Sequence, residues 1–126
     1  MLTVLPIQSK ETQKELCEKC GVKYNENAFA YRADDGDFIG ICQFYFENNN
    51  GYIENLTYAP EISDWEAMII MLRATMSFMY RCGLHYSYLN AETDSGELLK
   101  KSGFVINDDG KYYIDLKKFY GGSCCQ

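Results

Sequence analysis

The spacing of hydrophobic positions along the chain separates extended segments from helical ones. Three short, aromatic-rich segments are divided by turns rich in Asn, Asp and Gly, as expected for consecutive strands. From residue 63 to residue 82 the apolar side chains instead recur at every third or fourth position, which is the period of a helix. Ser63 with Glu66 forms a predicted capping box at its start, and Gly83 is the expected terminating residue. The predicted strands are residues 28–33, 38–47 and 52–58, with turns at 34–37 and 48–51.

Shorter segments complete the pattern on both sides of this region. An apolar run at residues 2–5 is stopped by Pro6 and is expected to form an edge strand. A helix over residues 10–20 should begin at the capping residue Ser9 and end at Gly21. A strand directly after the long helix allows a parallel crossover to an earlier strand. The remaining predicted elements are a strand over 84–90, a short helix over 93–101, a hairpin of 104–106 with 111–116, and a frayed tail at 121–126.

Composition is that of an ordinary globular α/β protein with a single domain over residues 1–126. The chain is 47% apolar and 24% charged. A net charge of −6 and a pI of about 4.7 argue against binding to nucleic acid or to an anionic membrane surface. The N-terminal apolar run lacks a basic leader, and the most apolar stretch, 65–80, is interrupted by Glu66 and Arg73. We therefore expect neither a signal peptide nor a membrane-spanning helix, and a cytoplasmic location.

Six cysteines raise the alternatives of a zinc site and a redox pair. Cys17 and Cys20 form a C-x-x-C pair, but they lie in a predicted helix and do not follow a strand. Cys124 and Cys125 are adjacent, without the spacing that wraps a metal. We therefore expect free thiols and no metal. Two further cysteines lie in apolar runs and are expected to be small core residues: Cys42 and Cys82.

The order of the predicted elements, together with two short motifs, resembles the GNAT superfamily of N-acetyltransferases. The segment 53–61, Ile-Glu-Asn-Leu-Thr-Tyr-Ala-Pro-Glu, is similar to the fourth strand of that family and its exit. The segment 98–104, Leu-Leu-Lys-Lys-Ser-Gly-Phe, is similar to a later family motif that ends in Gly-Phe. The resemblance covers residues 28–116 and implies an α/β (α+β) fold. It implies a mixed, mostly antiparallel sheet, flanked by helices and holding one parallel strand pair. The region before it has one predicted helix where two are usual, and those helices help to form the family's acceptor pocket.

The resemblance also implies a site for acetyl-CoA as co-substrate. In this family the pantetheine arm lies between two diverging strands, and the pyrophosphate lies at the start of the following helix. The basic residue and the two glycines of the family's phosphate loop are replaced here by Ser63, Glu66 and Met68, and Asp64 and Glu66 place two negative charges there. The residues in the matching positions are Leu56, Thr57, Tyr58, Ser63, Trp65, Ala67, Met68 and Asn90.

The resemblance assigns the catalytic base to Glu54, which occupies the position of a carboxylate that acts through water. A charged residue on the solvent face of a strand is the alternative interpretation of Glu54. The family's acid, a tyrosine, is replaced by Leu99, so that Tyr86 or Tyr88 is left as a substitute or as a packing residue. His85 is the only histidine and is expected to be a hydrogen-bonded structural residue.

Two functions follow from these observations. The first is an N-acyltransferase that moves an acetyl group from acetyl-CoA to a small-molecule or peptide amine. The second is a GNAT-fold binding module that has lost catalysis, which is favoured by the altered phosphate loop, the missing tyrosine and the shortened N-terminal region. A homodimer is compatible with both.

Overall fold

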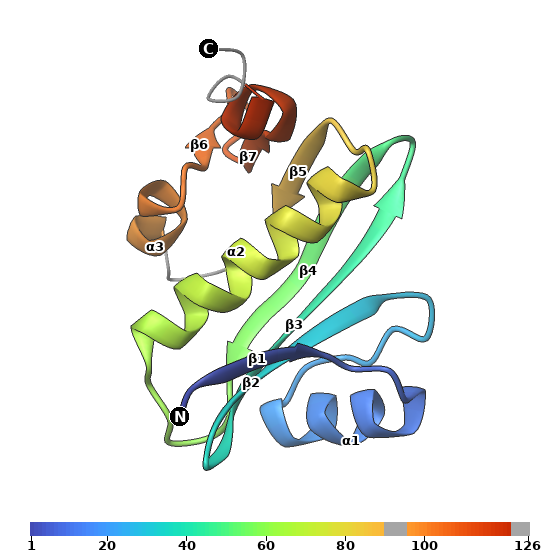
Figure 1. Ribbon diagram of the computed structural model, residues 1–126, viewed down its shortest axis with the longest axis vertical. Helices are drawn as coiled ribbons and strands as arrows, with labels where there is room; N and C mark the ends of the chain where they lie inside the picture. The colour runs from blue at the N-terminus through green and yellow to red at the C-terminus, as the bar shows by residue number, and fades with distance from the viewer. Residues whose placement is uncertain (90–95, 122–126) are drawn as a thin grey trace.

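Seven strands form one sheet in the computed structural model, which describes residues 1–89 and 96–121. The order across the sheet is β1-β2-β3-β4-β5-β7-β6 (Figure 1). The strands are β1 (Thr3–Pro6), β2 (Phe29–Asp35), β3 (Asp37–Glu47), β4 (Asn50–Tyr58), β5 (Tyr86–Leu89), β6 (Val105–Ile106) and β7 (Tyr112–Asp115). The helices are α1 (Lys10–Cys20), α2 (Trp65–Arg81), α3 (Gly96–Lys101) and the short π-helix η1 (Lys117–Gly121).

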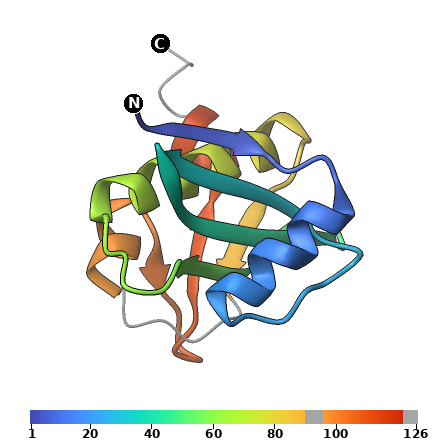
Figure 2. The same cartoon turned by 90° about the horizontal axis from the view of Figure 1, so that it is seen from below.

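The sheet is mixed, as predicted. Strands β2, β3 and β4 form the expected antiparallel meander, and β4 and β5 are the parallel pair. Helix α2 makes the crossover between them on one face, and α1 lies on the opposite face (Figure 2). The predicted edge strand, the single N-terminal helix and the C-terminal hairpin are all present.

Each face of the sheet has its own apolar cluster. The larger one packs α2 and α3 against the sheet and includes Phe44, Ile53, Met71 and Met79. The smaller one lies under α1 and is built from Leu16, Cys17, Ala30 and Ile41. Within the described residues, no helix is both long enough and apolar enough to span a bilayer.

Helix α2 starts one residue later than the predicted capping box requires. Its N-cap is Asp64, whose carboxylate accepts a hydrogen bond from Ala67 N at 3.1 Å. The capping box of Ser63 and Glu66 is therefore wrong, because an Asp caps as well as a Ser and stands nearer to the helix. At the other end the predicted Gly83 has φ +84 and terminates the helix. Cys82, the C-cap residue, is exposed, so its prediction as a core residue is also wrong.

The turn between β3 and β4 consists of Asn48 and Asn49 alone, which both have positive φ (52° and 69°). This is the signature of a two-residue hairpin, and Asn tolerates it well. Gly51 was predicted to belong to this turn, but it lies within β4 and is buried. A Cβ at Gly51 would overlap the side chain of Met79, so the glycine serves close packing of α2 on the sheet.

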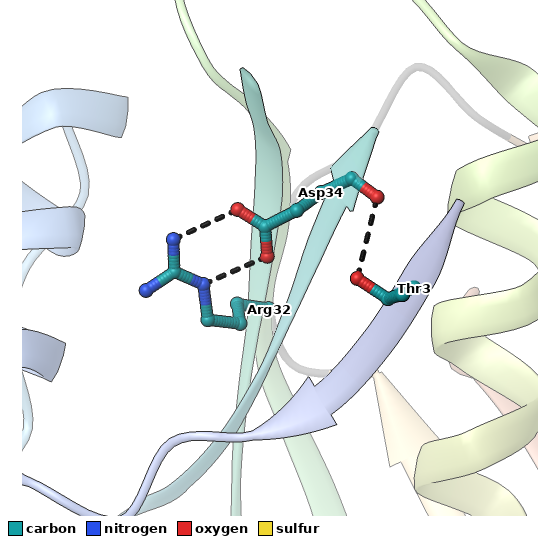
Figure 3. A network of polar contacts seen from close by, with 3 residues as sticks. All are labelled: Thr3, Arg32 and Asp34. Carbon is teal, nitrogen blue, oxygen red and sulfur yellow. Dashed lines mark hydrogen bonds and ion pairs between the residues drawn. The ribbon is translucent and has the colours of Figure 1, made fainter. Parts of the chain in front are cut away.

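Polar contacts secure the edge of the sheet between β1 and β2 (Figure 3). The Arg32 guanidinium donates two hydrogen bonds of 2.8 Å to the Asp34 carboxylate, one from Nε and one from Nη2. The Thr3 hydroxyl donates to the Asp34 carbonyl at 3.5 Å. These contacts lie beside a register shift between Ala33 and Asp34, where the strand bends.

Candidate functional site

Strand β4 is longer than its parallel partner, and this difference creates the candidate site. Strand β5 pairs with β4 only opposite Gly51, Tyr52 and Ile53, whereas β4 continues to Tyr58. Residues 55–58 of β4 therefore pair with β3 on one side, and residues 54–58 lie beyond the last pairing with β5 on the other. The resemblance placed the pantetheine arm beside this part of the strand.

The backbone of this segment is directed into the space beyond β5. The Ala59 N–H donates to the Ile39 carbonyl at 2.8 Å, and hydrogen-bonded pairs alternate along an antiparallel ladder. Since Ala59 and Ile39 form a hydrogen-bonded pair, the pairs of Tyr58 with Gly40 and of Leu56 with Cys42 are not hydrogen-bonded. The N–H and C=O groups of Leu56 and Tyr58 therefore point away from β3. Leu56 and Tyr58 therefore offer backbone donors where β5 has ended, while the backbone groups of Thr57 face β3.

A β-bulge at Glu54 marks the point where the two parallel strands separate. Gln43 pairs with Asn55 and Phe44 pairs with Ile53, so Glu54 is one extra residue in β4. A bulge bends its strand and increases the local twist. The bend begins directly after Ile53, the last residue that pairs with β5.

Glu54 lies on the α1 face and borders a hollow of about 700 Å³. Its Oε1 accepts a hydrogen bond of 2.9 Å from Asn25 Nδ2, in the loop between α1 and β2. The hollow is lined by residues 23–27 of that loop together with Glu54 and Asn55. Glu54 is half-buried, and its carboxylate, bonded to the neutral amide of Asn25, is accessible from the hollow.

A buried polar network supports this loop, and the sequence reasoning missed it. Gln43 is fully buried, and its Oε1 accepts from Gln13 Nε2 at 2.8 Å and from Asn25 N at 3.2 Å. Its Nε2 donates to the Lys23 carbonyl at 2.8 Å and to Asn55 Oδ1 at 2.7 Å. The one available signal was an amide in the middle of an otherwise apolar strand, since such a residue is buried only with its hydrogen bonds satisfied.

At the start of α2, the predicted phosphate site, Asp64 binds two backbone amides. Besides the Asp64 carboxylate on Ala67 N, the Asp64 carbonyl accepts from Met68 N at 3.2 Å. The side chains of Ala67 and Met68 are buried in the core, while Ser63 and Trp65 are exposed. The Lys101 ammonium lies over the Trp65 ring, with Nζ 4.8 Å from the ring centroid.

Tyr58 connects the exit of β4 to the start of α2. Burial, as the largest cause, raises the pKa of Tyr58, so this phenol stays protonated near neutral pH. The Ser63 side chain and the backbone of Asp64 are near enough to its hydroxyl to lower the pKa of Tyr58 in part. The structure thus brings Leu56, Tyr58 and Ser63 to one end of β4. Asn90 lies outside the described residues.

Leu99 stands where the resemblance places an acidic tyrosine, and this position is not accessible to a substrate. The Leu99 side chain is fully buried in the core. Of the two alternative tyrosines, Tyr86 stacks on His85 with ring centroids 4.1 Å apart. Tyr88 belongs to a row across the α1 face, in which four tyrosines are register partners: Tyr45, Tyr52, Tyr88 and Tyr113. Ring centroids are 5.2 Å apart for Tyr45–Tyr52 and 5.4 Å for Tyr52–Tyr88. Burial, and then the neighbouring phenols, raise the pKa of Tyr88.

His85 and the described cysteines have structural surroundings. His85 Nε2 lies 3.3–3.4 Å from the Asp115 carboxylate, in agreement with the predicted hydrogen-bonded role. Burial raises the pKa of Cys17 and of Cys20 to about 11, and that of Cys42 to about 12. In residues 1–89 and 96–121 no group of three or more His, Cys, Asp or Glu side chains is placed to hold a metal. Cys124 and Cys125 lie outside the described residues.

Comparison with known proteins identifies the fold. No model of a known protein family matches the chain, and no curated protein sequence does. An IAA acetyltransferase from Bacillus cereus superposes with a TM-score of 0.75 at 15% identity, covering 91% of this chain and 99% of that one. A dodecameric spermidine N-acetyltransferase from Vibrio cholerae gives 0.70 at 14% identity, covering 97% and 98%. The PaiA N-acetyltransferase of Thermoplasma acidophilum, solved in complex with coenzyme A, gives 0.65 at 13% identity, covering 90% and 99%. At these identities the likeness is one of fold.

Proposed function

We propose that this chain, which has the fold of the GNAT acetyltransferases, is an N-acyltransferase that uses acetyl-CoA as donor and an amine as acceptor. The observation that carries the proposal is the edge of β4 beyond Ile53, which has no strand partner within residues 1–89 and 96–121 and on which the backbone N–H groups of Leu56 and Tyr58 are directed away from β3. A neighbour of the same fold was solved with coenzyme A, and others are named as spermidine N-acetyltransferases. They support a thioester donor and an amine acceptor.

In the proposed reaction the acceptor enters from the hollow beside Glu54. The Glu54 carboxylate accepts a proton from the ammonium group through a water molecule. The neutral amine then forms a C–N bond with the thioester carbonyl carbon. As the C–S bond breaks and the coenzyme A thiolate departs, the new amide nitrogen loses its remaining extra proton to solvent water. Backbone N–H groups of β4 stabilise the negative charge that develops on the carbonyl oxygen. With Leu99 buried, the thiolate takes its proton from solvent.

Contacts at the start of α2 set the affinity for the donor. The β4 edge fits the amide-bearing arm, but the pyrophosphate end meets Asp64 on the Ala67 N–H and the exposed Glu66 carboxylate. A phosphate charge about 5 Å from a carboxylate near the surface is repelled by roughly 3 kcal/mol before salt screening. We therefore expect acetyl-CoA to bind in the high micromolar range or more weakly.

Calorimetric titration with acetyl-CoA tests the donor site. Asp64→Asn keeps a good N-cap and removes one charge, and it should strengthen binding by about three- to thirtyfold at low salt. Glu66→Gln removes the second charge without touching the cap. Glu47→Gln, an equal charge change beside Asn50 at the opposite end of β4, is the matched control and should bind like the unmodified protein. Tight binding by the unmodified protein would refute the electrostatic argument.

The catalytic part is tested by acetyl transfer to a panel of polyamines and peptide N-termini, followed by mass spectrometry. Glu54→Gln should lower kcat by about 10²- to 10⁴-fold and leave the Kd of acetyl-CoA unchanged. Glu26→Gln, which alters another carboxylate on the same hollow, serves as its control. Equal activity of the Glu54 variant and the unmodified protein would remove Glu54 from the mechanism.

The second candidate function is a non-catalytic binding module. The specific observation that favours it is that Asp64 already accepts hydrogen bonds from two amides in the first turn of α2, those of Ala67 and Met68. If neither the unmodified protein nor Asp64→Asn binds acetyl-CoA, this second function replaces the first.

A further inference from the structure

A second hollow, of about 370 Å³, lies on the face of the sheet opposite Glu54. It is lined by residues from the end of β1, the start of β2 and the C-terminal turns of α2. Its size is within the range of small-molecule sites, and most of its lining is apolar or aromatic. The proposed acyl transfer makes no use of it.

Aromatic rings with free surface form the wall of this hollow. The Phe78 ring meets three others nearly edge-on, at 73° to Phe29, 82° to Tyr31 and 70° to Phe44. The corresponding centroids are 5.6, 6.4 and 5.9 Å apart, so the wall is well packed behind its surface. Phe29 is nevertheless 46% exposed, although it is the first residue of a strand in the middle of this cluster. An aromatic surface of this kind, left open in a concave site, favours a planar apolar ligand.

One cation lies at the rim, and no carboxylate accompanies it. Arg81 lines the hollow, and its Cζ is 6.0 Å from the centroid of the Phe78 ring. Its Nε donates to the Ser77 carbonyl at 3.3 Å. Among the described residues, Arg81 forms no ion pair, and no Asp or Glu lines the hollow. In a chain with 18 acidic and 12 basic residues, such a place is suited to an anion.

We propose that this hollow binds a small aromatic carboxylate, with its ring against Phe29, Tyr31 and Phe78 and its carboxylate on Arg81. A guanidinium accepts a carboxylate through two parallel hydrogen bonds, and the ring stacked near it limits its freedom. The site is separate from the acyl-transfer site, so it does not depend on the proposed function. Its ligand would be a regulator or a carried metabolite of this chemical class.

Three naphthalene probes of equal ring size test the assignment in the absence of coenzyme. 2-Naphthoate carries the carboxylate, 2-naphthylmethanol is neutral and 2-naphthylmethylamine is cationic. Binding is followed by amide chemical shifts in two-dimensional NMR, which also locate the probe. We expect 2-naphthoate to bind more tightly than the other two and to shift the amides of Phe29 and Arg81.

Variants then separate the charge from the rings. Arg81→Gln should weaken 2-naphthoate about three- to tenfold and leave 2-naphthylmethanol unchanged. Arg73→Gln, the same change at an exposed position of the same helix, should alter neither. Phe29→Ala should weaken both probes by about fivefold or more, with the fold checked by circular dichroism.

Each contrary result overturns the proposal. Equal affinity for the acid and the alcohol would leave only an apolar depression. An equal loss in Arg73→Gln would trace the effect to net charge. Shifts confined to residues 54–58 would place the probe in the other site, and the absence of shifts at millimolar probe would mean that the hollow binds no such ligand.

Discussion

Replacing Gln43 with Leu should destabilise the fold by about 2–4 kcal/mol, although Leu has a similar size and is apolar. Gln43 satisfies both of its donors and both of its acceptor positions through four hydrogen bonds. Each bond contributes about 1 kcal/mol net, and a buried group left without a partner costs about 1–3 kcal/mol. In the variant the Asn25 N–H loses its acceptor. Gln13 is less affected, because its Nε2 still donates to the Asn25 and Ala28 carbonyls at 3.4 and 3.3 Å. The greater apolar burial of Leu offsets about 1–2 kcal/mol of this loss.

Urea denaturation followed by circular dichroism measures this loss as a midpoint lowered by about 1–3 M. Amide exchange should accelerate in the loop of residues 22–28, since Gln43 binds Lys23 and Asn25 there. Ser87→Ala is the control, because Ser87 is buried and its hydroxyl has no hydrogen bond within the described residues. It should change stability by less than about 0.5 kcal/mol. A Gln43→Leu variant as stable as this control, with loop exchange unchanged, would refute the assignment of the loop's stability to the network.

Three further predictions concern packing, pH and thiol reactivity. Gly51→Ala should cost about 1–3 kcal/mol in urea denaturation, because its Cβ overlaps Met79 and α2 must shift. The Lys118 N–H, and then His85, lower the pKa of Asp115, so its contribution to stability is present above a pH of about 4 and is lost as the pH falls through the lowered pKa. Lowering the pH through this range should therefore reduce the free energy of unfolding more for the unmodified protein than for Asp115→Asn, as measured by urea denaturation at each pH. With the two C-terminal cysteines replaced by serine, Ellman's reagent should modify the exposed Cys82 first, while the thiols whose pKa is raised to about 11 or 12 react slowly.

The fold could be predicted from the sequence because its signals are local and repeated. Apolar periodicity located α2, and turn residues located the meander, so that the order of elements alone indicated the parallel crossover. The errors occurred where two readings of one local pattern compete. Ser63 and Asp64 are both good N-caps, and only the path of the chain decides between them. Gly51 follows an Asn run and resembles a turn residue, but its role depends on Met79, which lies 28 positions further along the chain.

The sequence predicted individual residues of the candidate site, but it did not predict how they are arranged, because the arrangement depends on where β4 and β5 separate. Glu54 was identified by its place in a motif, but no pattern indicated its partner Asn25 or the network behind it. Such contacts join a loop to two strands, and pairing between distant polar residues leaves no period in the sequence.

The bulge at Glu54 explains why these features occur at one place. An extra residue turns Glu54 and Asn55 toward α1, where one meets Asn25 and the other meets Gln43. The same insertion bends β4 after its last pairing with β5, so that the strand that carries the carboxylate also exposes its backbone donors. The bulge therefore determines both the direction of the Glu54 carboxylate and the course of the strand edge, whereas the proposed phosphate contacts on α2 can change without disturbing either.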